Sequence, residues 1–205
     1  MKKFKILTVA LLALLVFSFP FPLRAGAPTD QLRSTVDRVL AILQDPKLKS
    51  EDKKTERRDE LRKVIYERFD FNEMAKRSLG PNWRQRSPEE QREFVNLFTE
   101  LLENTYADKM ESYNGEKVLY AREKPDRDDA EVDTEVVTKK GEFSINYKLH
   151  PVGADWKVYD VVIENISLVN NYRSQFNHVL ASSSFDDLLR RMRQKQFAAP
   201  ETKRS

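Results

Sequence analysis

The 205-residue sequence contains no cysteine, two histidines and five glycines. The absence of cysteine excludes thiol catalysis, thiolate metal sites, disulfide staples and a lipid-modified N-terminal cysteine. His150 and His178 lie far apart and lack the spacing of metal ligands. No GxSxG, P-loop or dinucleotide-binding motif occurs, and no spacing among the many carboxylates singles out an acid/base pair. The sequence therefore predicts a protein that is not an enzyme and has no cofactor or metal.

The N-terminus has the pattern of a secretory signal peptide. Three lysines precede an apolar run, Ile6–Phe19, which is shorter than a membrane span requires. Ala25-Gly26-Ala27 supplies small residues for cleavage, but Pro28 would make a poor first residue, so the position of the cut stays open. We predict removal of residues 1–27; an uncleaved anchor is the alternative.

Removal of the leader changes the charge of the protein. Residues 1–27 carry four basic and no acidic side chains, so the mature chain has 32 basic and 33 acidic residues, a net charge of −1. A nucleic-acid partner is not expected, because such partners require an excess of Lys and Arg. The remaining length suits one well-buried domain. We predict this domain over residues 28–197 and a disordered tail over residues 198–205.

Apolar residues recur at helical spacing through the first half. The predicted helices are one around Leu32–Leu43, one around Leu61–Phe69, a short one from Asp70 to Gly80 and a long one from Pro88 to about Tyr113. Asp70 is placed to cap the short helix, and Gly80 is placed to end it. Ser87 and Glu90 are placed to form a capping box for the long helix. The apolar positions of this helix cover more than one face, which indicates packing on two sides.

The second half switches to the alternation of β-strands. We predict four strands, near 117–123, 130–139, 142–150 and 156–164, joined as an antiparallel meander. Two helices follow, Leu168–Ala181 and about Asp186–Gln196. The expected fold is α+β, with a helical N-terminal half packed on a curved four-stranded sheet.

The last predicted strand is apolar on both faces. Strict alternation puts Trp156, Val158 and Val162 on one side and Tyr159, Val161 and Ile163 on the other. Asp160 interrupts this strand and is either a catalytic base or a carboxylate paired with an arginine or a helix terminus. We favour the pairing, because buried charges are usually satisfied.

The abundant apolar surface has two interpretations. It forms either an ordinary filled core or an apolar cavity between the sheet and the helices. Because the exported domain has little chemistry available, we favour a cavity that carries an apolar ligand.

Three blocks of sequence resemble one known family. FDFNEMAKRSLGPNW, SPEEQREF and WKVYDVVIENISLVNNYRSQF are similar to the MlaC family, also called the toluene-tolerance auxiliary family, and the resemblance extends over about Thr29–Lys195. It implies an NTF2/cystatin-like fold and a soluble, monomeric periplasmic phospholipid carrier. Such carriers shuttle lipid between an outer-membrane lipoprotein–porin complex and an inner-membrane ABC transporter with an MCE-domain subunit. One departure is Asn165, where the family pattern has Gly; Asn tolerates left-handed backbone better than most residues.

The apolar faces of the predicted helices and strands, together with the family resemblance, predict which residues contact the lipid. They are Trp83, Phe94, Phe98, Leu101, Leu102, Tyr106, Phe143, Ile145, Tyr147, Leu149, Tyr159, Ile163, Tyr172 and Phe176. Arg173 either meets the lipid phosphate or anchors its helix by pairing with Asp160 or another acid. We favour the structural role, because a promiscuous carrier has little need of a tight phosphate clamp.

The alternative function is a periplasmic chaperone that binds unfolded polypeptide. Such a protein would need an exposed apolar groove instead of an enclosed cavity. A hydrolase on a related scaffold lacks support, since no nucleophile and base are evident.

Overall fold

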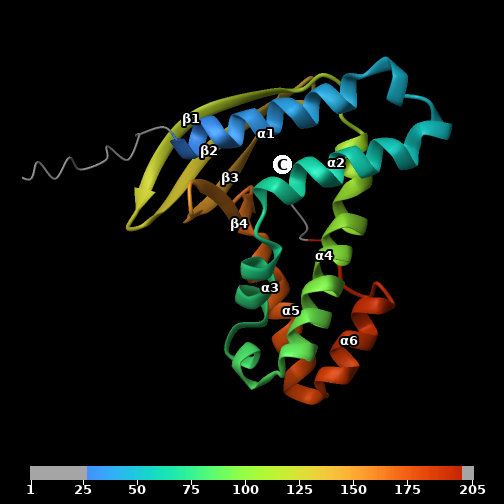
Figure 1. The fold of residues 1–205 in the computed structure, drawn as a ribbon, viewed down its shortest axis with the longest axis vertical. Helices are drawn as coiled ribbons and strands as arrows, with labels where there is room; N and C mark the ends of the chain where they lie inside the picture. Colours follow the sequence, from blue (N-terminus) through green and yellow to red (C-terminus); the bar gives the residue numbers. More distant parts are fainter. Residues whose placement is uncertain (1–26, 200–205) are drawn as a thin grey trace, which may run out of the picture.

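The computed structural model describes residues 27–199 (Figure 1). The predicted signal peptide, apart from Ala27, and the predicted tail beyond residue 199 lie outside the described residues. Within residues 27–199, no helix combines the length and apolar character needed to cross a membrane.

Helices occupy the first half and the C-terminal end, and strands lie between them, as predicted. The helices are α1 (Ala27–Gln44), α2 (Lys54–Arg68), α3 (Phe71–Leu79), α4 (Pro88–Glu111), α5 (Leu168–Ser182) and α6 (Phe185–Arg193), with short 3₁₀ turns at Pro46–Leu48, Glu51–Lys53 and Gly80–Gln85. The strands are β1 (Lys117–Asp126), β2 (Asp129–Thr138), β3 (Gly141–Val152), β4 (Asp155–Ile163) and β5 (Ile166–Ser167).

The local signals for helix ends are confirmed. Asp70 caps α3 by accepting a hydrogen bond from the Glu73 amide. Ser87 and Glu90 form the reciprocal capping box at the start of α4. Gly80 ends α3 with a φ of 60°, in the left-handed region that favours glycine.

The sheet is an antiparallel meander in the order β1-β2-β3-β4-β5, with five strands instead of the predicted four. Glu164 and Asn165 have φ angles of 48° and 65°, which make a tight reversal after β4. The chain then pairs Ile166 and Ser167 back onto β4. Asn165 therefore adopts the left-handed backbone that glycine would favour, and the turn before α5 survives.

A β-bulge at Tyr159 overturns the predicted alternation in β4. Lys148 pairs with Asp160 and Leu149 pairs with Val158, so Tyr159 is an extra residue in its strand. The extra residue shifts every later side chain to the opposite face from the one that strict alternation predicts. The β4 residues that face the same hydrophobic cluster are Trp156, Val158 and Val161, with Ile163 packed against its edge.

The hydrophobic interior consists of two clusters. The helical cluster is formed by α3, α4, α5 and α6, and includes Phe94, Phe98, Tyr172 and Phe176. The sheet cluster is formed by Leu32 of α1, Leu168 of α5 and buried residues of β2, β3 and β4, and α1 contacts β1, β2 and β4 (Figure 1). Phe69 and Tyr106 pack against both clusters. These two aromatic side chains therefore join the halves of the interior.

Candidate functional site

The structure divides the residues nominated as lipid contacts between the two clusters. Phe94, Phe98, Leu101, Leu102, Tyr172 and Phe176 are buried in the helical cluster, with Trp83 packed at its edge. Leu149 is buried in the sheet cluster, with Ile145, Tyr147 and Ile163 packed against it. Phe143 lies on the same sheet face, two residues before Ile145 in β3. The nominated residues of the helices and those of the sheet therefore belong to different parts of the interior, and Tyr106 packs against both.

The helical cluster is densely packed with aromatic rings. Phe98 meets the rings of Tyr172 and Phe176 edge-on, with centroids 5.7 and 6.1 Å apart. Phe94 meets Phe176 at 5.5 Å and Phe185 at 6.1 Å. Phe94, Phe98, Tyr172 and Phe176 are all 0% exposed. This arrangement has the character of a filled structural core.

The sheet face is less completely covered. The side chains of Phe143, Ile145, Tyr147 and Ile163 are half-buried, although they lie on the face that α1 covers. Burial raises the pKa of Tyr147 to about 12. Apolar side chains that keep accessible surface are what an apolar ligand slot requires.

Three buried tyrosine hydroxyls lack hydrogen-bond partners. Among the residues that the structure describes, they are those of Tyr106 on α4, Tyr120 on β1 and Tyr172 on α5. Burial raises the pKa of all three groups; Tyr172 further raises that of Tyr106, and Tyr147 further raises that of Tyr120. Because Tyr106 and Tyr172 lie next to each other and buried polar groups are usually satisfied, Tyr120 is the hydroxyl that points to a water or ligand. Tyr120 was not among the predicted lipid contacts, because its only signal in the sequence was its place in the alternation of β1.

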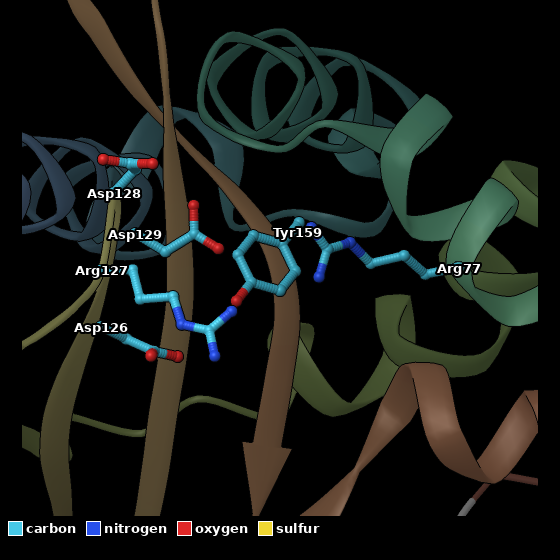
Figure 2. Close-up of a pocket in the computed structure, with 6 residues that line it drawn as sticks. All are labelled: Arg77, Asp126, Arg127, Asp128, Asp129 and Tyr159. Carbon is cyan, nitrogen blue, oxygen red and sulfur yellow. The ribbon is translucent and has the colours of Figure 1, made fainter.

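Tyr159 does not join the other nominated residues, because the bulge places Val161 and Ile163 on the face of Val158 and leaves Tyr159 on the opposite face. It lines a pocket of about 420 Å³ with Arg77 and the β1–β2 turn residues Asp126, Arg127, Asp128 and Asp129 (Figure 2). The Arg77 guanidinium lies 3.8 Å from the centre of the Tyr159 ring. Charged side chains dominate this pocket, so it is unsuited to an acyl chain.

Asp160 and Arg173 have structural partners, but they do not pair with each other. Asp160 is buried and accepts hydrogen bonds from the Ser167 hydroxyl at 2.6 Å and the Val169 amide at 3.1 Å. The predicted pairing of Asp160 with a helix terminus is therefore confirmed, at the start of α5. The Nε of Arg173 donates to the Arg77 carbonyl at 2.8 Å, which ties α5 to the end of α3.

A second pocket, of about 530 Å³, opens between α2, α3 and α4. Its lining residues are Tyr66, Phe69, Asp70, Phe71, Asn72, Val95, Asn96, Thr99, Glu100, Val152 and Lys157. We call it the α2–α4 groove. This groove was not predicted from the sequence, since its residues come from separate segments. Among residues 27–199, no group of three or more His, Asp or Glu side chains is arranged to hold a metal ion.

Comparisons with known proteins agree with this architecture. The chain is 23% identical over 199 residues to the intermembrane phospholipid transport system binding protein MlaC of Haemophilus influenzae, covering 94% of this chain and 92% of that protein. It is 25% identical over 179 residues to toluene tolerance protein ttg2D of Pseudomonas putida, covering 84% of this chain and 83% of that protein.

A solved structure has the same fold. The phospholipid-binding protein from Ralstonia solanacearum, in complex with a phospholipid, matches with a TM-score of 0.72 and 26% identity over 81% of this chain and 94% of that chain. The profile of the family described as MlaC protein matches residues 33–194, which is most of the sequence. This protein therefore belongs to the MlaC family.

Proposed function

We propose that this protein is a periplasmic phospholipid carrier that holds acyl chains against the half-buried sheet face. The observation that carries the proposal is the incompletely covered face bearing Phe143, Ile145, Tyr147 and Ile163, with Leu149 at its base. The likeness to a phospholipid complex supports it. Tyr106, which packs against both clusters, is proposed to form the opposite side of the slot. The filled helical cluster packs against Tyr106 and holds it in place.

The physics of lipid transfer explains the need for such a slot. A diacyl phospholipid has about 30 chain methylenes, each costing ~0.8 kcal/mol to expose to water, or ~24 kcal/mol in total. A carrier that shields the chains removes most of this cost, while the headgroup can stay in water. Net affinity has to stay modest so that the lipid can be delivered. The proposed activity is therefore binding and release, without a covalent step.

The wider role that we propose is transport between membranes. The carrier would shuttle lipid between an outer-membrane lipoprotein–porin complex and an inner-membrane ABC transporter with an MCE-domain subunit, and so maintain outer-membrane lipid asymmetry. The names of the two sequence relatives support this role. The remaining nominated residues, including Arg173 as a headgroup contact, stay predictions.

Mass spectrometry of an organic extract tests the proposal. Protein purified gently from the periplasmic fraction should yield near-stoichiometric phospholipid with little headgroup selectivity. Lipid-free protein that also takes up no phospholipid from donor vesicles would reject the carrier function. Suppression of aggregation of an unfolded polypeptide, with no lipid uptake, would favour the chaperone instead.

A further inference from the structure

Charged side chains join α2 to α4. Of the 15 residues of α2, Leu61 and Val64 are buried. Arg58, Arg62 and Tyr66 recur every four residues and therefore share one face of α2. This face meets the carboxylates of α4, and Figure 1 shows α2 passing across that helix. We call these contacts the α2–α4 seam.

The seam has two ion-pair centres. Near the start of α2, Arg58 donates to Glu111 at 2.9 Å and to Asp108 at 2.7 Å, and Arg57 lies 3.4 Å from Glu111. One and two turns farther along α2, Arg62 Nε and the Tyr66 hydroxyl both donate to Glu103 at 2.8 Å.

The seam differs in kind from the other contacts of α4. On its other side, α4 meets α5 and α6 through buried rings, including Phe94 against Phe176 and Phe185. The side chains of Arg58 and Arg62 are 37% and 46% exposed, whereas those of Arg57 and Glu111 are each 11% exposed. Most of the cations of the seam are therefore within reach of water. Exposed ion pairs contribute little net stability, because their charges are well solvated when they separate. The seam is therefore easier to open than the aromatic interfaces of the same helix.

The seam also lies between the α2–α4 groove at the surface and the two hydrophobic clusters. Tyr66 belongs both to the seam and to the lining of the α2–α4 groove. Phe69 lines this groove and packs against both hydrophobic clusters. Tyr106, one helical turn after Glu103, also packs against both clusters. Separation of α2 from α4 would thus connect the groove with the proposed slot.

On the basis of the proposed function, we infer that the α2–α4 seam is the lateral gate through which acyl chains enter and leave. Its ion pairs keep the slot closed in water and form again after each transfer. When the gate opens, its arginines can exchange carboxylate oxygens for phosphate oxygens of the passing lipid, because guanidinium groups bind both anions in the same geometry. The carboxylates that they leave are then solvated.

The lack of cysteine allows a direct test by crosslinking. Arg62→Cys/Glu103→Cys is joined across the seam with a short bismaleimide. The matched control, Glu93→Cys/Arg193→Cys, replaces an ion pair that joins α4 to α6. Exchange of fluorescent phospholipid between the full mature protein and vesicles is then measured, with circular dichroism melting to verify the fold.

We expect the crosslink at 62–103 to slow lipid exchange at least tenfold, whereas the control crosslink leaves it unchanged. The uncrosslinked 62–103 variant should exchange at least as fast as the wild type. A crosslink at Arg58→Cys/Glu111→Cys should reproduce the block if the first pair perturbs folding. If the folded, crosslinked protein exchanges lipid at an unchanged rate, the gate is rejected and the proposed function is not affected. A wild-type protein that takes up no phospholipid overturns the proposed function and the gate with it.

Discussion

At the scale of single residues, Asp160 shows how one buried carboxylate joins the sheet to a helix. It lies in β4 and accepts hydrogen bonds from the Ser167 hydroxyl and the Val169 amide. Both donors are at the N-terminus of α5, where unpaired amides and the helix dipole favour a negative charge. The acid therefore sets the position of α5, which carries Tyr172 and Phe176 into the helical cluster.

Replacement of Asp160 should measure this anchoring. Asp160→Ala leaves the Val169 amide unpaired in a buried site, so we expect the free energy of unfolding to fall by ~2–3 kcal/mol. Asp160→Asn keeps one acceptor oxygen and should lose about half as much. Urea denaturation followed by circular dichroism gives both values. A loss below ~0.5 kcal/mol in Asp160→Ala would contradict the anchoring role.

At the scale of elements, the α2–α4 seam is governed by charge. The hydrogen bond from Arg58 holds the pKa of Glu111 below its ordinary value, against the opposing effect of burial. A carboxyl whose pKa is lower in the folded state stabilises that state above its unfolded pKa, and the contribution is lost as pH falls through the folded pKa. The Glu111 contacts therefore persist at neutral and mildly acidic pH.

The rate of lipid exchange should follow this electrostatic behaviour. We expect no change between about pH 7 and pH 5, and faster exchange only once the pH falls below the ordinary range of a glutamate, where Glu111 becomes protonated. At neutral pH, an increase in salt from about 0.05 M to about 0.5 M should speed exchange several-fold by screening the exposed pairs. Glu111→Gln should exchange faster at low salt and respond less to salt. Equal salt dependence in both proteins would count against the seam.

At the scale of the whole molecule, the two hydrophobic clusters have different properties. Leu101 in the helical cluster is 4% exposed and is surrounded by other buried side chains. Ile145 at the sheet cluster is half-buried and keeps accessible surface. A charge introduced into a filled core is costly to bury, whereas a charge in an open slot can remain hydrated.

Two substitutions separate these cases. Leu101→Glu should destabilise the protein by ~4 kcal/mol or more, because it places an unpaired charge in a filled core. Ile145→Glu should leave the protein folded but prevent lipid loading, because the charge lies where acyl chains bind. Circular dichroism melting and lipid extraction of the same samples provide the comparison. A folded Ile145→Glu variant that still carries phospholipid would show that the slot lies elsewhere.

The sequence by itself determined the local features of this protein. The caps at Asp70 and Ser87, the stop at Gly80 and the change from helices to strands were predicted, because each depends on residues close together in the chain. The family resemblance was confirmed for the same reason, since its motifs are runs of adjacent residues.

The tertiary structure alone decided which residues share a site. The bulge at Tyr159 arises from pairing with β3, and it placed Ile163 on the face of Val158, apart from Tyr159. Two hydrogen bonds join residues that are distant in the chain: Arg173 donates to a carbonyl of α3, and Arg62 donates to Glu103. Periodicity states which face of an element is apolar, but it does not state which element covers that face. The packing of the helices therefore decides which apolar residues form the filled core and which remain half-buried on the sheet face.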